Sequence, residues 1–216
     1  MIKDIKKRII TSLILLLLVF FMLINNYVLI FFLLICGVFS LIEFFNLISI
    51  IFKNNVISKF LSNFIFISYI FIYCIFFVIL SSILNLKILI FIILFTCVAS
   101  DIGGYVFGKI FKGPKLTKLS PKKTISGSIG SFVFSTLTIC ISVNFITDNL
   151  DFYIVVVGLL TSLGCQIGDL FFSFLKRKSK LKDTGHFLPG HGGVLDRIDG
   201  ILLGIPVGFL SLLIIY

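Results

Sequence analysis

The stretch FYIVVVGLLTSLGCQIGDLFFSFL, residues 152–175, decides what kind of fold this chain adopts. It is almost entirely apolar, and Asp169 is its one charged residue. About 20 consecutive apolar residues are enough to cross the hydrocarbon core of a bilayer as a helix. The stretch therefore predicts a transmembrane helix with a carboxylate inside it, and Lys176 and Arg177 follow at its end.

The rest of the chain repeats this pattern. Hydrophobic residues make up 59% of the 216 residues and charged residues only 13%, far from the average of a soluble domain. We predict an all-α, polytopic membrane bundle of about seven helices, folded as a single integral domain over residues 1–216. The predicted spans are 9–24, 28–52, 60–84, 86–107, 126–147, 152–175 and 199–216. Residues 1–95 hold the N-terminal spans, and residues 96–216 form a catalytic half with polar loops at 101–125 and 176–198.

The charges are distributed unequally between the two sides of these spans. Every lysine and arginine except Lys87 falls on the side of the N-terminus, whereas Asp148 and Asp151 fall on the other. The positive-inside rule then places the N-terminus and both polar loops in the cytoplasm. We predict a multi-pass protein of the cytoplasmic membrane with its site facing the cytoplasm. The net charge of +10 then points to anionic headgroups or phosphates, and we expect no nucleic-acid partner.

Three aspartates lie at or inside the hydrophobic boundaries: Asp101, Asp169 and Asp196. An aspartate inside a span costs about 2.5–3.5 kcal/mol even on the lenient insertion scale, so a functional role is its default interpretation. Glu43 is a fourth such acid, but it lacks polar neighbours in the sequence. Its alternatives stay open: a functional role, a buried hydrogen bond, or a pairing with a lysine.

The polar loops combine acids, bases and glycines. Asp196 and Asp199 are spaced to share one helix face, and the turn at 191–193 offers backbone N–H groups to an anion. In LSPKKTISGSIG, residues 119–130, Lys122 and Lys123 precede hydroxyls that either cap the next helix or contact phosphate. Carboxylates favour Mg²⁺, and the cations suit phosphates. Together they predict a phosphoryl-transfer site, although no P-loop and no GxSxG motif is present.

The stretch SFLKRKSKLKDTGHFLPGHGGVLDRID, residues 173–199, resembles the signature of the phosphatidate cytidylyltransferases, the CDP-diacylglycerol synthases. The stretches SDIGGYVFGKIFK (100–112) and LSPKKTISGSIG (119–130) also look like motifs of that family. The signature positions are Ser173, Lys176, Arg177, Lys182, Asp183, Gly185, Pro189, His191, Gly192, Gly193, Val194, Asp196 and Arg197. The resemblance covers residues 96–216, whereas residues 1–95 match only as hydrophobic spans.

The resemblance implies a nucleotidyltransferase of phospholipid biosynthesis that converts CTP and phosphatidate of the inner leaflet into CDP-diacylglycerol and pyrophosphate. It also implies a metal site in which Asp169 and Asp196 are the matching carboxylates. We expect Mg²⁺ there, with Asp199 as a further ligand, and we leave open a second, monovalent cation and a homodimer. The expected catalytic residues are Asp169, Asp196, Lys176, Arg177 and Arg197. The expected substrate-binding residues are Lys122, Lys123, Ser173, Lys182, His191, Gly192, Gly193 and Asp101.

Two other functions remain as alternatives. A CTP-dependent polyprenol or phytol kinase would share the membrane fold and the nucleotide, but it would release CDP rather than pyrophosphate. A transporter, which is not an enzyme, would also place aspartates and glycines inside the membrane. It would not need two cationic loops on one face.

Overall fold

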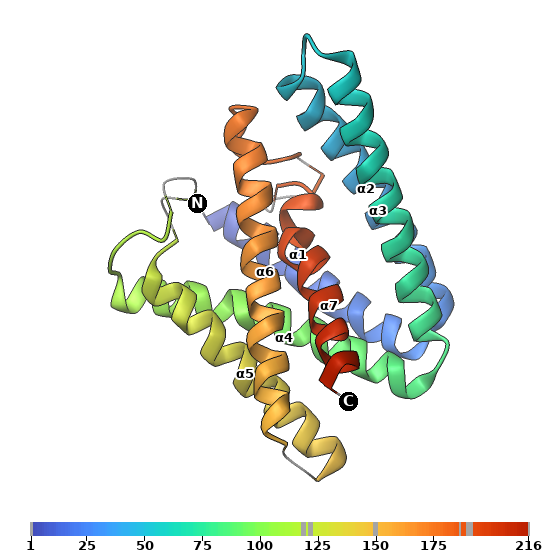
Figure 1. The fold of residues 1–216 in the computed structure, drawn as a ribbon, viewed down its shortest axis with the longest axis vertical. Helices are drawn as coiled ribbons and strands as arrows, with labels where there is room; N and C mark the ends of the chain where they lie inside the picture. The colour runs from blue at the N-terminus through green and yellow to red at the C-terminus, as the bar shows by residue number, and fades with distance from the viewer. Residues whose placement is uncertain are drawn as a thin grey trace. The chain divides into compact units, whose positions relative to one another are not determined.

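In a computed structural model, the described residues of the chain form seven helices (Figure 1). The structure describes residues 2–117, 120, 123–148, 151–185, 187–188 and 192–215, with side chains from residue 13 to residue 214. The helices are α1 (Ile2–Ile24), α2 (Asn26–Ile51), α3 (Val56–Ser81), α4 (Leu84–Phe111), α5 (Ile125–Thr147), α6 (Phe152–Lys178) and α7 (Leu195–Ile215). The described residues form no strand, only two isolated β-bridges. The all-α prediction is therefore confirmed.

Among the residues that the structure describes, six helices, α2 to α7, are long and apolar enough to cross a membrane. In α1, the part with described side chains is the shorter apolar segment Leu13–Ile24. Several boundaries differ from the prediction by a few residues. The one that bears on the site is the end of α4, which continues to Phe111, so the polar loop begins only after it. Asp101 therefore lies on a helix. Gly103 and Gly104 do not end this helix, since both pack closely against α5.

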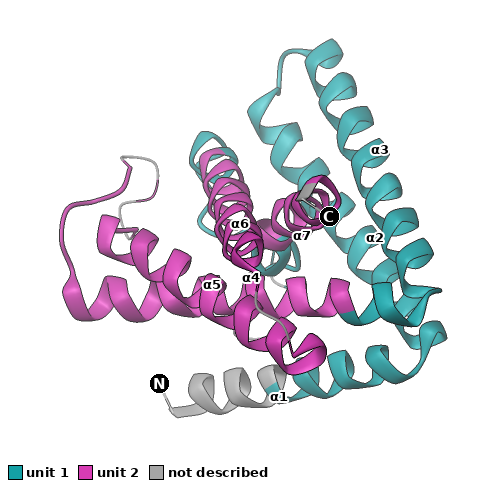
Figure 2. Ribbon diagram, turned by 60° about the horizontal axis from the view of Figure 1, so that its bottom comes forward, with its two compact units in different colours: residues 1–88, 175–198 teal, residues 89–174, 199–216 magenta. Residues whose placement is uncertain are grey.

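The helices contribute to two compact units, which Figure 2 draws in different colours. Unit 1 comprises residues 1–88 and 175–198, and unit 2 comprises residues 89–174 and 199–216. The boundaries between them fall within α4, α6 and α7.

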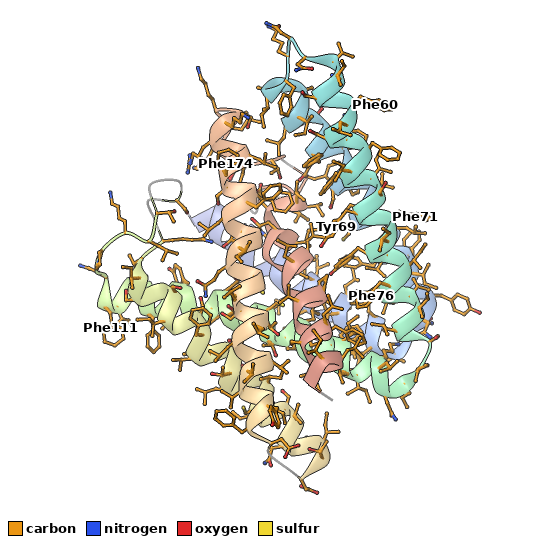
Figure 3. All side chains as sticks on the ribbon, in the orientation of Figure 1. Phe60, Tyr69, Phe71, Phe76, Phe111 and Phe174 are labelled. Carbon is orange, nitrogen blue, oxygen red and sulfur yellow. The ribbon has the colours of Figure 1, made fainter. Side chains whose placement is uncertain are left out.

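Unit 1 is built on α2 and α3, which lie side by side (Figure 1). Asparagines cap both helices: the side chain of Asn25 accepts from the N–H of Tyr27, and that of Asn55 from the N–H of Ser58. The rings of Phe44 and Phe66 stack between the helices with centroids 3.8 Å apart. Other phenylalanines of α3, such as Phe60 and Phe71, project from the helix and are exposed, as lipid-facing rings are (Figure 3).

The turn between α3 and α4 is short, as predicted, but it lies a few residues earlier than expected. Lys87 is therefore in the first turn of α4, where it is buried and donates to Oδ1 of Asn26 at 2.6 Å. The amide of Asn26 in turn donates to the carbonyl of Ser81 at 3.4 Å. These contacts tie the start of α2 to the α3–α4 turn, so Lys87 has a structural partner inside unit 1.

Unit 2 owes its packing to glycines where helices cross. A Cβ on Gly127 of α5 would lie 2.8 Å from the carbonyl oxygen of Gly104 on α4. On α6, a Cβ on Gly164 would lie 3.1 Å from the carbonyl oxygen of Leu203 on α7, and one on Gly168 would be closer still to Asp199. Close approach of small residues is how helices associate in membranes. Gly164 and Gly168 thus have a packing role between α6 and α7.

Candidate functional site

The loop after α4 in unit 2 folds back on itself before α5 begins. Lys112 and Gly113 adopt positive φ values of 52° and 101°, which turn the chain sharply at the end of the helix. An antiparallel bridge pairs Lys115 with Thr124, and the N–H of Leu116 donates to the carbonyl of Lys123 at 2.8 Å. These backbone hydrogen bonds thereby fix the position of Lys123 at the end of the loop.

The hydroxyls that follow have structural partners. Thr124 is the N-cap of α5, and its side chain accepts from the N–H of Gly127 at 3.1 Å. Ser126 donates to the carbonyl of Lys112, and Ser128 donates to Oε1 of Gln166 on α6. Of the two roles left open for these hydroxyls, capping is confirmed for Thr124. Ser128 instead links α5 to the polar face of α6.

A cavity of about 240 Å³ opens between these elements of unit 2. Its lining residues are Asp101, Gly104, Tyr105, Leu116, Lys123, Thr124, Gly127, Ser128, Ser131, Gln166 and Asp169. Within it, the ammonium of Lys123 forms an ion pair with Oδ2 of Asp169. Both side chains are partly exposed, by 26% and 30% respectively. The cavity thus brings together two predicted carboxylates, Asp101 and Asp169, and one predicted phosphate-binding lysine.

Unit 1 holds a second ion pair, between Lys176 at the end of α6 and Asp196 in the first turn of α7. Nζ of Lys176 lies 2.7 Å from Oδ1 of Asp196, and their side chains are 14% and 8% exposed. Oδ2 of Asp196 accepts from the N–H groups of Thr184 and Gly193, at 2.8 and 3.1 Å. The hydroxyl of Thr184 lies 3.0 Å from the same oxygen. Asp196 therefore fastens the glycine turn and the preceding loop to the start of α7.

Glu43 reaches this loop from α2. The side chain is buried, and its carboxylate accepts from the N–H groups of Val194 and Leu195, both at 2.9 Å. Its Oε2 also lies 2.6 Å from the hydroxyl of Thr184. Among the open interpretations of Glu43, the buried hydrogen bond is confirmed. Sequence reasoning gave Thr184 and Gln166 no role, because neither carries a charge that a span would reject.

The remaining predicted site residues lie in several settings. Arg177, Lys182 and Arg197 are exposed, Ser173 is half-buried on α6, and Gly192 has a φ of 85°. Asp199 is buried in unit 2, where its Oδ1 accepts from the N–H of Gly200 at 2.9 Å. Lys122 and His191 lie outside the described residues. Within the described ranges, no three His, Cys, Asp or Glu side chains converge as a metal-ligand set.

Two carboxylates of unit 1, those of Glu43 and Asp196, thus hold described residues of the signature segment 173–199. In unit 2, Lys123 and Thr124 of the stretch LSPKKTISGSIG line a cavity. A model of the cytidylyltransferase family matches residues 50–215, most of the chain and both of these segments. The chain belongs to the cytidylyltransferase family. This confirms the relationship that the signature at 173–199 indicated.

Individual relatives agree with the family. The chain is 41% identical over 128 residues to a phosphatidate cytidylyltransferase of Rickettsia felis, covering 55% of this chain and 56% of the relative. It is 36% identical over 124 residues to a phosphatidate cytidylyltransferase of Mycobacterium leprae, covering 57% of this chain and 40% of the relative. The matches thus span about half the length of these curated relatives, or less.

Proposed function

We propose that this cytidylyltransferase-family chain is a phosphatidate cytidylyltransferase. An oxygen of the phosphatidate phosphate attacks the α-phosphorus of CTP, the bond from that phosphorus to the bridging oxygen breaks, and pyrophosphate leaves. The products are CDP-diacylglycerol and pyrophosphate. The observation that carries the proposal is that a lysine from each of two motif segments, Lys123 and Lys176, forms an ion pair with a predicted site aspartate, Asp169 and Asp196 respectively. The names of the relatives support the same activity.

This reaction asks mainly for charge compensation and positioning. Phosphatidate is already ionised near neutral pH, so the nucleophile needs no general base. CTP and phosphatidate are both anionic and repel each other until cations hold them in line. In the proposal, Lys123 binds phosphate from the loop before α5. Lys176, Arg177 and Arg197 do so around the signature loop, which is the part of the signature between α6 and α7. The exposed guanidinium groups of Arg177 and Arg197 suit this role because they can bind phosphate through two hydrogen bonds.

The carboxylates fit a divalent cation. Asp169 and Asp196 each hold a lysine ammonium in this structure, so each is placed to bind positive charge. The cavity of unit 2 adds neutral oxygens from Ser128 and Gln166 beside the carboxylates of Asp101 and Asp169, a hard donor set that suits Mg²⁺. We propose Asp169 and Asp196 as its carboxylate ligands, and Asp199 as a third ligand remains a prediction. When bound, Mg²⁺ would neutralise the charge that develops on the departing pyrophosphate.

The membrane setting belongs to the same proposal. The six long apolar helices are those of a multi-pass membrane protein. From the charge asymmetry we propose that the protein lies in the cytoplasmic membrane with this site facing the cytoplasm, where CTP is available. Phosphatidate would then reach the site from the inner leaflet. A homodimer remains a prediction.

The test uses purified protein in detergent with phosphatidate, Mg²⁺ and CTP labelled in the cytosine ring. We expect lipid-extractable label with an equal amount of pyrophosphate, and loss of both in Asp169→Asn and Asp196→Asn. The matched control is Asp151→Asn, which removes an exposed carboxylate just before α6. Label remaining in water as CDP, with phosphate on an added polyprenol, would instead identify the kinase. Folded wild-type protein that does not turn over CTP would overturn the proposal.

A further inference from the structure

Glu43 is a buried acid that neither the signature nor the proposed chemistry uses. It lies on α2, before residue 50, where the family match begins. The residue is only 5% exposed and is surrounded along α2 by apolar side chains. A buried carboxylate in such a helix is costly unless its hydrogen bonds are satisfied. Its partners therefore indicate why it is there.

Within the described part of the chain, the three hydrogen-bond partners of Glu43 all belong to the signature loop between α6 and α7 or to the start of α7. Oε1 accepts from the N–H of Val194 and Oε2 from the N–H of Leu195, where α7 begins. The first N–H groups of a helix have no partner within the helix, and the helix dipole favours a negative charge beside them. Glu43 thus fixes the start of α7 one residue before Asp196.

The third partner links Glu43 to Asp196 through a single hydroxyl. Oγ1 of Thr184 lies 2.6 Å from Oε2 of Glu43 and 3.0 Å from Oδ2 of Asp196. A threonine hydroxyl has only one proton to donate, so it can serve one of the two carboxylates at a time. The shorter distance assigns that proton to Glu43. The N–H of Thr184 still donates to Asp196 at 2.8 Å, so Glu43 holds in place a residue that orients Asp196.

We propose that Glu43 is a positioning residue that sets the orientation of the Asp196 carboxylate by holding Thr184 and the first N–H groups of α7. The inference rests on the proposed function for its kinetic consequence, but the placement of the loop can be measured without it. Glu43 does not touch substrate in this account. It acts through Thr184 and through the backbone of residues 194 and 195.

The first test measures hydrogen–deuterium exchange of the full-length protein in detergent, comparing wild type with Glu43→Gln. A glutamine keeps the size of the side chain but replaces one accepting oxygen with an NH₂ group. Because hydrogen bonds to a charged acceptor are stronger than neutral ones, we expect exchange at residues 193–195 to accelerate about tenfold or more. Peptides from α5 should keep their rates. Unchanged exchange at 193–195 would overturn the proposal.

The matched control is Ser40→Ala, on the same helix one turn before Glu43. Ser40 is also fully buried, but its hydroxyl donates to the carbonyl of Cys36 within α2. The variant removes a buried polar group without touching the signature loop. We expect it to leave exchange at 193–195 and the turnover of CTP unchanged. If it matched Glu43→Gln in both measurements, the effect would come from α2 as a whole and the proposal would fall.

The second test separates positioning from general destabilisation by kinetics. A small misplacement of a reacting group can lower a rate by about 100-fold, so we expect Glu43→Gln to lower kcat by about 10- to 100-fold. The KM for CTP should stay close to that of wild type, because Glu43 is not a nucleotide contact. If total CTP turnover fell only in proportion to the amount of folded protein, kcat per folded molecule would be unchanged. That result would overturn the proposal.

Variants of Thr184 keep the test decisive if Glu43→Gln does not fold. Thr184→Val removes the shared hydroxyl and should lower kcat, whereas Thr184→Ser retains it and should recover most of that loss. In the double variant with Glu43→Gln, the effects should fall short of additive, because both substitutions break one link. Wild-type kcat in folded Thr184→Val would overturn the proposal. If wild type itself shows no CTP turnover, the proposed function fails, and the exchange measurement still decides the placement of the loop.

Discussion

Unit 1 and unit 2 each hold an aspartate against a lysine, but the two aspartates differ in their surroundings. Asp196 of unit 1 accepts from Lys176 and from two backbone N–H groups, and its side chain is 8% exposed. Asp169 of unit 2 is 30% exposed, lines a cavity, and takes its one hydrogen bond within the described residues from Lys123. The difference indicates that Asp196 holds the loop before α7 in place through several hydrogen bonds. Asp169 instead has a partly solvated lysine partner that a bound cation can replace.

The lysines differ in the same direction. Lys176 lies in the last turn of α6, in unit 1, and 14% of its side chain is exposed. Lys123 lies in the loop before α5, which backbone hydrogen bonds hold in shape. Its side chain is 26% exposed, about twice as much as that of Lys176. A partly solvated ion pair contributes little to stability, whereas a buried one is sensitive to the loss of either partner. Replacing the aspartate with asparagine should therefore lower the free energy of unfolding more in unit 1 than in unit 2.

The largest effect on stability is expected from Asp196→Asn. The change replaces the carboxylate that faces the mostly buried ammonium of Lys176 with a neutral amide, and it can turn an NH₂ group toward the N–H donors of Thr184 and Gly193. Losing one partner of a buried pair typically costs about 3–5 kcal/mol of the free energy of unfolding. Thermal unfolding in detergent measures the loss. The double variant Asp196→Asn/Lys176→Met, which also removes the ammonium and keeps an oxygen for the N–H groups of Thr184 and Gly193, should be the more stable of the two. If Asp196→Asn were as stable as wild type, the Lys176–Asp196 pair would be no more sensitive to the loss of a partner than the Lys123–Asp169 pair.

A second contrast concerns helix packing in the two units, and its expected effect is smaller. A methyl group on Gly130 of α5 would lie 2.6 Å from the carbonyl oxygen of Gly103 and would collide with the ring of Phe107. On α2 of unit 1, a methyl group on Gly37 would meet Ile70 at 3.4 Å, an ordinary contact. We expect Gly130→Ala to lower the free energy of unfolding by about 1–3 kcal/mol through overpacking. Gly37→Ala should be neutral or stabilising, as alanine is in a helix.

Melting temperatures of both glycine variants in the same detergent test this contrast. A stable Gly130→Ala would mean that α4 and α5 can separate without loss. Unit 2 would then lack the close contact that brings Asp101, on α4, to the same cavity as Lys123 and Asp169.

The sequence predicted the helices well because a membrane span needs a long apolar run, and each run is visible by itself. It also predicted that Asp101, Asp169 and Asp196 matter, because a charge inside such a run stands out. The end of α4 was predicted at residue 107 but lies at Phe111, because the apolar run stops at Phe107 and Gly108 and Lys109 follow it. Gly108 approaches Gly127 of α5, a tertiary contact that no local pattern contains.

The partners of the polar residues were beyond the sequence for a similar reason. Glu43 stands 141 residues before Thr184, and Lys123 stands 46 residues before Asp169. Pairings over such distances depend on how helices pack, and a hydroxyl such as that of Thr184 carries no signal in a hydropathy pattern. The sequence did single out Glu43 and left a buried hydrogen bond open for it, but it did not identify the donors. A glutamate in the middle of an apolar helix needs several donors, and a helix start supplies them.

The smallest effect on stability, and the sharpest test of the comparison, is expected from Asp169→Asn. Its ion pair with Lys123 is partly solvated, so the free energy of unfolding should change by no more than about 1 kcal/mol. CTP turnover should nonetheless be lost, because the proposed cation ligand is gone. Measuring both quantities on one preparation separates the two aspartates: Asp196→Asn should lose stability and activity together, and Asp169→Asn activity alone. A strongly destabilised Asp169→Asn would show that this pair, too, holds its unit together, and the cavity of unit 2 would then be a structural joint rather than an exchangeable cation site.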